Sequence, residues 1–186
     1  MGLWLRLQSF LLYRRATLKL TAIRAQQRAS GRVNIYIDDE YAFSLQAILA
    51  ARLTVGQELS EDQIAELKAS DAVEKAYERA LNYLSYRPRS EDEIRRYLAK
   101  RSLSDGEIDQ VVARLKRARF LDDKAFAEFW VENREAFRPR GSWALRGELR
   151  QKGVSPETIE AALEGLDEKD SAMRAASPAV RRYRQQ

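Results

Sequence analysis

The sequence predicts a mostly α-helical protein, in which tandem three-helix repeats form an elongated array behind a small antiparallel β meander. The first observation is a period of 51 residues in the second half of the chain, where the Arg-Pro-Arg of residues 87–89 returns at 138–140. Apolar positions and a helix-start serine recur at the same offset. A fixed period of this size is typical of stacked supersecondary units. The second observation is that strand-like alternation is confined to residues 17–45.

The β meander is predicted from three short runs. Residues 17–23 and 32–37 alternate apolar and polar side chains, and residues 41–45 form a third run. Asp38-Asp39 predicts a tight turn between the last two strands. Because such a small sheet is marginal alone, we expect it to pack on a helix. Three aromatic side chains are expected to bury one face of the sheet: Tyr36, Tyr41 and Phe43.

The later helices are predicted from their starts. Four serines precede helical apolar patterns: Ser60, Ser90, Ser104 and Ser155. The first three are followed at the third position by Glu or Gln, which is the capping-box pattern, and the fourth is followed by proline at the first helical position. Asp122 or Asp123 is expected to cap a helix that buries Phe126, Phe129 and Trp130.

These signals divide the chain into five segments. They are an N-terminal extension (1–16), a β-rich head with short helices (17–71), a first three-helix repeat (72–121), a second (122–166) and the start of an incomplete third (167–186). The extension is apolar but too short to span a bilayer and has no cleavage-site pattern. An amphipathic helix touching a membrane or a partner is the alternative for this extension. We expect a cytoplasmic protein.

Composition leaves only carboxylate, lysine, serine or tyrosine chemistry open for an enzyme, and no Walker, Rossmann or hydrolase motif is present. The chain contains no cysteine and no histidine, which excludes disulfides, thiol nucleophiles, thiolate metal sites and imidazole acid–base chemistry. The acidic pair Asp122-Asp123 could be taken for a catalytic or metal site, but no third carboxylate stands nearby in sequence and a helix N-cap explains at least one of the two residues. We therefore expect no cofactor, no metal and no catalytic residue.

Positive charge is concentrated in the repeats. Residues 79–152 hold 18 Lys and Arg against 12 Asp and Glu, a net charge of +6. If the repeats stack regularly, two equivalent basic patches are expected on one side, which favours an anionic partner. The candidate partner- or DNA-binding residues are Arg87, Arg89, Arg95, Arg96, Lys100, Arg101, Arg138, Arg140, Arg146, Arg150 and Lys152. A merely solvated helical face and simple turn chemistry at the prolines are the alternatives. Trp143 is a weaker candidate for a contact.

Several motifs resemble the RecX family. The stretch from Ala80 to Leu98 resembles the first repeat of that family, and residues 120–127 resemble its repeat junction. Residues 140–154 are similar to its second repeat, and residues 34–43 match the β-rich head of many members. The resemblance covers about residues 17–166. Members usually carry three full helical repeats, whereas the third here stops after a helix at most.

The resemblance implies a regulator of the RecA recombinase. Family members bind in the groove of the RecA filament on single-stranded DNA, lower its ATP hydrolysis, extension and strand exchange, and so modulate recombination and the SOS response negatively. The implied partner is the RecA filament, with single- or double-stranded DNA left open as a second partner. We expect a monomer without membrane association. The alternative, argued from the basic three-helix units, is a helix-turn-helix-like DNA-binding module that acts independently of RecA.

Overall fold

The computed structural model describes residues 17–27, 31–138 and 140–166. The predicted extension at 1–16 and the predicted start of a third repeat at 167–186 lie outside the described residues. Contacts divide the chain into two compact units, Met1–Lys75 and Ala76–Gln186. The predicted boundary between residues 71 and 72 falls inside one continuous helix, α3 (Glu61–Ser85).

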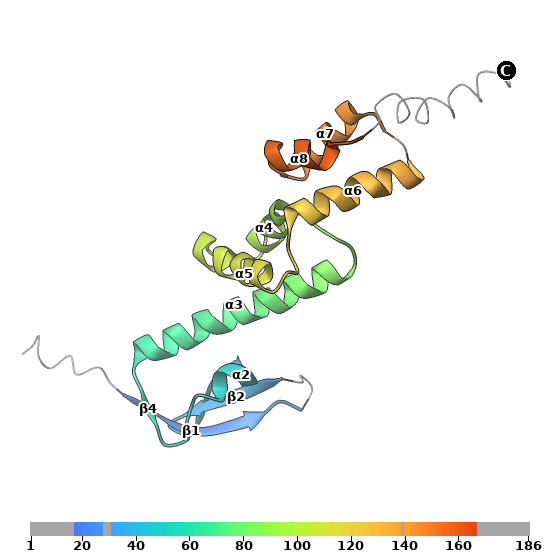
Figure 1. Cartoon of the computed structure of the whole chain (residues 1–186). Coiled ribbons are helices and arrows are strands. Elements are labelled where there is room, and N and C mark those ends of the chain that lie inside the picture. Colours follow the sequence, from blue (N-terminus) through green and yellow to red (C-terminus); the bar gives the residue numbers. More distant parts are fainter. Residues whose placement is uncertain (1–16, 28–30, 139, 167–186) are drawn as a thin grey trace, which may run out of the picture. The chain divides into compact units, whose positions relative to one another are not determined.

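The first unit contains the predicted meander and one additional strand (Figure 1). Its strands are β1 (Leu18–Ala25), β2 (Arg32–Ile37), β3 (Glu40–Gln46) and β4 (Glu58–Leu59), in the antiparallel order β3-β2-β1-β4. Asp38 and Asp39 have φ angles of 49° and 67°, the left-handed pair that a tight hairpin turn requires. The predicted turn is confirmed. The short helix α2 (Ala47–Ala50) follows β3.

Burial in the sheet differs from the prediction at Tyr41. Phe43 is buried, but Tyr41 is 59% exposed and only lies edge-on to the half-buried ring of Tyr36. The register of β2 and β3 shifts between Ile35 and Tyr36, so a bulge at Ala42 turns Tyr41 off the core face. The expectation that Tyr41 is buried is therefore wrong.

A buried carboxylate ties the sheet of the first unit to the first part of α3. Asp71 is 4% exposed and accepts hydrogen bonds from the Arg32 guanidinium and from the Gln46 N–H at 2.8 Å. Lys75 adds an ion pair at 2.7 Å. Burial alone would raise the pKa of Asp71, but these donors and charges outweigh it and lower the pKa.

The second unit contains two three-helix repeats. The first comprises α3 from Ala76 onward, α4 (Glu91–Ala99) and α5 (Asp105–Arg117), and the second comprises α6 (Asp123–Phe137), α7 (Ser142–Gln151) and α8 (Pro156–Leu163) (Figure 1). The predicted caps are confirmed: Ser90 and Ser104 form capping boxes, Asp122 accepts two backbone N–H groups of α6, and Ser155 caps α8. Ser60 and Gln63 form the same reciprocal pair at the start of α3.

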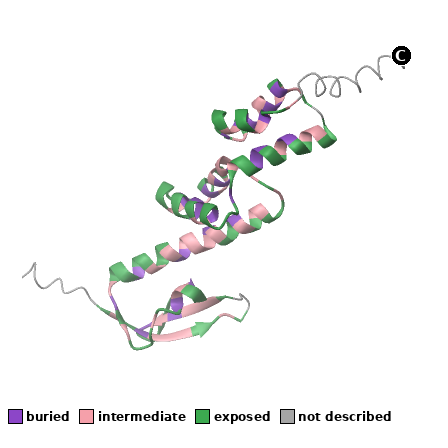
Figure 2. Ribbon diagram, viewed as in Figure 1, coloured by how far each residue is buried: buried purple, intermediate pink, exposed green. Residues whose placement is uncertain are grey.

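Residues that match at the 51-residue offset fill equivalent core positions. Figure 2 shows buried residues on the helices of both repeats. The buried pairs are Ile94 and Leu145, Leu98 and Leu149, Ile108 and Ile159, and Val112 and Leu163. On α6, Phe126 is buried and Trp130 half-buried, as predicted, but Phe129 is 42% exposed. The core face of α6 is completed instead by Ala127 and Val131, and at 3.6 residues per turn Phe129 points away from it. Among the described helices, none is both long enough and apolar enough to cross a bilayer.

Candidate partner-binding surface

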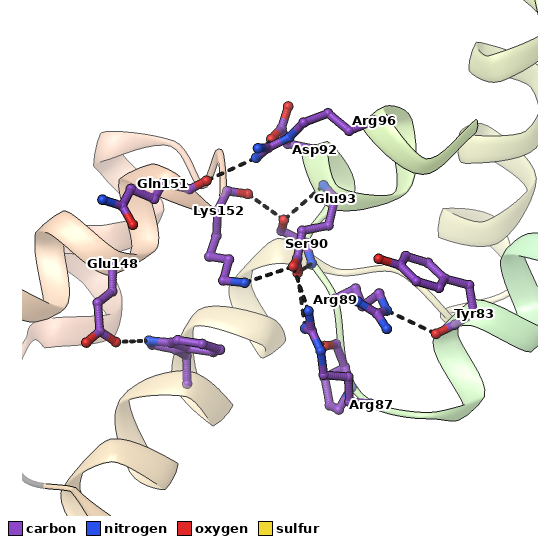
Figure 3. Close-up of polar contacts among 12 residues, drawn as sticks. Tyr83, Arg87, Arg89, Ser90, Asp92, Glu93, Arg96, Glu148, Gln151 and Lys152 are labelled. Carbon is purple, nitrogen blue, oxygen red and sulfur yellow. Dashed lines mark hydrogen bonds and ion pairs between the residues drawn. The ribbon is translucent and has the colours of Figure 1, made fainter. Parts of the chain in front are cut away.

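The first Arg-Pro-Arg turn is held by bonds within its own repeat (Figure 3). The Arg87 guanidinium donates to Glu93, with Nη2 2.8 Å from Oε1. Arg89 Nε donates to the Tyr83 carbonyl at 3.0 Å, and its guanidinium carbon lies 3.4 Å from the Tyr83 ring centroid. Tyr83 in turn stacks on Tyr97, with centroids 3.9 Å apart. Both cations of this turn therefore stabilise the turn itself.

Glu93 joins this turn to the second repeat. Its carboxylate accepts from Lys152 Nζ at 2.8 Å as well as from Arg87, and it completes the capping box of Ser90 (Figure 3). Burial raises the pKa of Glu93, but the hydrogen bonds and charges of Arg87 and Lys152 outweigh it and lower the pKa from 4.5 to about 2. The carboxylate is thus held in its charged form at neutral pH.

Three further backbone contacts connect the repeats around the start of α4. Ser90 Oγ donates to the Lys152 carbonyl, and Arg96 Nη2 donates to the Gln151 carbonyl at 3.0 Å (Figure 3). The Glu91 N–H donates to Asp123 Oδ1 at 2.7 Å. Ser90 is fully buried, so this junction excludes water at its centre.

The pKa of Asp123 is raised, whereas that of Glu93 is lowered. Burial raises the pKa of Asp123, and the negative charges of Glu91 and Asp122 act in the same direction. The hydrogen bond from the Glu91 N–H and the charge of Lys116 oppose this rise without cancelling it. The junction therefore contains one carboxylate with a lowered pKa and one with a raised pKa.

Arg95 and Arg146 form the same ion pair in each repeat. Arg95 Nη1 lies 2.7 Å from Asp109 Oδ1, and Arg146 Nε lies 2.8 Å from Glu160 Oε1. Asp109 and Glu160 are themselves 51 residues apart, so the internal repeat includes a brace between the second and third helices. Arg95 also pairs with Glu91, and Arg96 pairs with Asp92. The sequence contains signals for these acidic partners. Glu91 and Asp92 each lie four residues before the arginine that they pair with, and Asp109 and Glu160 recur at the 51-residue period.

The remaining candidate residues differ in the hydrogen bonds and ring contacts that they make. Arg101 lies over the Tyr97 ring, 3.6 Å from its centroid, and donates to the Tyr97 carbonyl. Arg150 is exposed and its Nε is 3.4 Å from the Arg146 carbonyl oxygen. Lys100 is exposed, and within the described part of the chain it has no hydrogen-bond or ion-pair partner.

The second Arg-Pro-Arg turn is not braced as the first is. Arg138 and Arg140 are exposed, and no carboxylate in the described ranges forms an ion pair with either. At the positions equivalent to the Tyr83–Tyr97 stack, Arg134 pairs with Glu148 at 2.7 Å, and Trp130 Nε1 also donates to that carboxylate. Both turns thus carry two arginines, but within the described ranges only the arginines of the second turn have no ion-pair partner and no aromatic ring against them. Their role as a binding surface remains a prediction.

Three protein-family models match this chain in order. The regulatory protein RecX N-terminal domain matches residues 18–60, the first three-helix domain of RecX matches 76–115 and the second matches 122–163.

Individual proteins give the same result. Regulatory protein RecX of Halalkalibacterium halodurans is 40% identical over 150 residues, covering 77% of this chain and 56% of that protein. Its Bacillus subtilis counterpart is 36% identical over 158 residues, covering 84% of this chain and 60% of that protein. The chain therefore spans less than two thirds of the length of these relatives.

Solved structures extend the match to the fold. A crystal structure of regulatory protein RecX superposes with a TM-score of 0.78 at 34% identity, covering 91% of this chain and 85% of that one. The crystal structure of RecX from Lactobacillus salivarius gives a TM-score of 0.56 at 26% identity, over 63% of this chain and 78% of that one. With the β sheet and both three-helix repeats matched in order, the chain belongs to the RecX family of regulatory proteins.

Proposed function

We propose that this protein binds the RecA filament on single-stranded DNA and inhibits its extension, ATP hydrolysis and strand exchange. It thereby acts as a negative modulator of recombination and of the SOS response. The observation that carries the proposal is the match of the sheet and both repeats, in order, to the domains of regulatory protein RecX. The family match also favours a regulator over an enzyme, and no group of metal-ligating side chains occurs among the described residues.

The distribution of cations supports a binding surface on the repeats. Lys100, Arg138 and Arg140 are exposed and, among the described residues, have no ion-pair partner that a binding partner would have to displace. Arg87, Arg95 and Arg96 are already paired with carboxylates of their own repeat. We therefore assign the first contacts with the filament to the three unengaged cations, because their charge is available without breaking the fold.

The test is RecA ATP hydrolysis on single-stranded DNA, with this protein titrated well below one molecule per RecA. Inhibition at sub-stoichiometric ratios supports a modulator that acts at filament ends or across several subunits. The triple variant Lys100→Gln, Arg138→Gln, Arg140→Gln should inhibit at least severalfold more weakly. A charge-matched control, Lys19→Gln, Arg52→Gln, Lys124→Gln, removes three other exposed cations and should inhibit nearly as well as the wild type.

The same titration separates the two candidate functions. A DNA-binding module that acts independently of RecA should bind naked DNA with steep salt dependence and leave ATP hydrolysis unchanged once free DNA is in excess. Absence of inhibition at any ratio, together with such binding, would replace the RecA proposal with this alternative.

A further inference from the structure

Two aromatic side chains flank the second Arg-Pro-Arg turn and face solvent. Trp143 is 83% exposed and Phe137 is 79% exposed, which are the two highest values among the large hydrophobic residues of the described chain. Arg138 and Arg140 lie between them in sequence and are exposed too. Single exposed hydrophobic side chains are common, but two large rings beside two unengaged guanidinium groups form a patch with a specific chemistry.

The sequence of this turn carries only positive charge. Residues 136–147 contain three arginines and no acidic residue. Of the acidic residues that border the stretch, Glu148 is held by Arg134 and Trp130. Arg140 acts on Glu148 only at longer range, where it contributes to lowering the pKa of that carboxyl.

The fold does not require this arrangement, as the first repeat shows. Tyr86 occupies the position equivalent to Phe137 and is also exposed, at 75%. The arginines of the first turn, however, are held by Glu93 and Tyr83, and Asp92 stands where the second repeat has Trp143. The second turn thus has two free guanidinium groups and an additional exposed ring that its own repeat does not use.

We propose that Phe137, Arg138, Arg140 and Trp143 form a contact site for single-stranded DNA. Unpaired bases stack on the two rings and the guanidinium groups bind the phosphates, which is the combination that single-strand-binding surfaces use. Five residues lie between Phe137 and Trp143, so their Cα atoms are at most about 22 Å apart and both rings lie within reach of one short strand. Duplex DNA offers its phosphates but keeps its bases paired, and an acidic peptide would neutralise the arginines without covering two flat rings.

This inference concerns naked DNA and does not depend on the proposed action on RecA. The experiment is fluorescence anisotropy of a labelled oligothymidine of roughly 15 nucleotides, titrated with the protein at several salt concentrations. Trp143→Ala should weaken binding at least about fivefold, the lower end of the loss for one base-stacking ring. Trp143→Phe retains a ring and should keep most of the affinity. Tyr86→Ala is the matched control in the first repeat and should bind like the wild type.

Replacing the two arginines should change how strongly the affinity for oligothymidine depends on salt. Arg138→Gln with Arg140→Gln removes two phosphate contacts, so the slope of log Kd against log salt should fall by about 1.4. Arg117→Gln with Lys124→Gln removes two exposed cations elsewhere on the repeats and should change the slope less. Because all the replaced side chains are exposed or half-buried, each variant should melt like the wild type.

Two outcomes would overturn the proposal. The first is equal oligothymidine affinity for the wild type and Trp143→Ala, and the second is an equal loss in Tyr86→Ala and Trp143→Ala. If, in the first case, Trp143→Ala also inhibits RecA weakly, the turn would be assigned to a protein partner instead.

Discussion

Gly153 lies at the tightest point of contact between the two repeats. Its φ is +75°, a conformation that side chains with a Cβ adopt at a cost, and it ends α7 one residue before the buried Val154. A Cβ on this residue would lie 2.3 Å from the Cβ of Asp92 at the start of α4. Glycine is therefore required both by the backbone conformation and by the approach of the other repeat.

Replacing this glycine should destabilise the protein through both effects. Gly153→Ala is expected to cost about 2–4 kcal/mol in the free energy of unfolding, because left-handed strain adds to overpacking. Gly165→Ala is the control: its φ is +87° but nothing lies within 4 Å of its missing Cβ, so it should cost only about 1–2 kcal/mol. Urea unfolding of the two variants measures the difference, and equal losses would show that the contact with Asp92 relaxes freely.

Glu93 should make stability depend on pH in the acid range. Its pKa is lowered from 4.5 to about 2, so its ionised form stabilises the folded state above pH 4.5 and this contribution is lost as the pH falls towards 2. Glu93→Gln should therefore lower the stability on the order of 2–3 kcal/mol at pH 7, and the difference from the wild type should shrink as the pH falls through this window. Chemical unfolding at a series of pH values measures it.

The control for this prediction is the next capping box along the chain. Glu107 makes the same contacts with Ser104 that Glu93 makes with Ser90, but no cation of the described residues forms an ion pair with it. Glu107→Gln should accordingly cost less than Glu93→Gln at neutral pH. If the two substitutions had the same effect, the pairs with Arg87 and Lys152 would contribute nothing measurable.

At the scale of single elements, α4 and α5 begin with the same cap in different surroundings. Ser90 and Ser104 each accept the N–H of the third helical residue, but Ser90 is fully buried and also donates to the Lys152 carbonyl. Ser104→Ala should cost about 1 kcal/mol, the usual loss of an N-cap. Ser90→Ala should cost about 2–4 kcal/mol, because it also removes the donor that the Lys152 carbonyl receives from a fully buried hydroxyl. Thermal unfolding of both variants gives the comparison, and equal melting temperatures would contradict it.

The sequence predicts those elements whose caps or turn residues lie within a few positions of one another. Helix starts were found because a cap and its partner lie three residues apart, and the hairpin turn was found from Asp38-Asp39. The sequence does not indicate strand β4, because two residues carry no alternation and its pairs with Leu18 and Lys19 span 41 and 39 residues. The predicted burial of Tyr41 is wrong because a bulge moves this side chain to the other face of the sheet, and the sequence pattern does not show the bulge.

The candidate surface was harder to predict than the fold for a related reason. Whether a cation is available depends on the acidic groups that the fold brings to it, such as Glu93 for both Arg87 and Lys152. The pair between Glu93 and Lys152 spans 59 residues and crosses from one repeat to the other, so no local pattern indicates it. The two turns have the same three residues in sequence but differ in what holds their arginines.

On the scale of the whole molecule, the junction should matter for function as well as for stability. Ordering two mobile repeats on binding costs free energy. A partner that contacts both repeats at once therefore binds more tightly when the repeats are already fixed relative to each other. The contacts of Glu93, Ser90 and Asp123 provide this fixed relation within the second unit. Substitutions at the junction should then weaken the proposed inhibition of RecA even though they remove no cation from the surface.

Glu93→Gln tests this against simple electrostatics. The substitution raises the net charge by one, so a partner attracted only by positive charge would bind this variant as well as the wild type or better. We expect instead that Glu93→Gln inhibits RecA ATP hydrolysis severalfold more weakly at neutral pH and at a temperature where the variant remains folded. Glu107→Gln raises the charge equally without touching the junction and should inhibit like the wild type. Equal inhibition by both variants would mean that the partner engages each repeat separately.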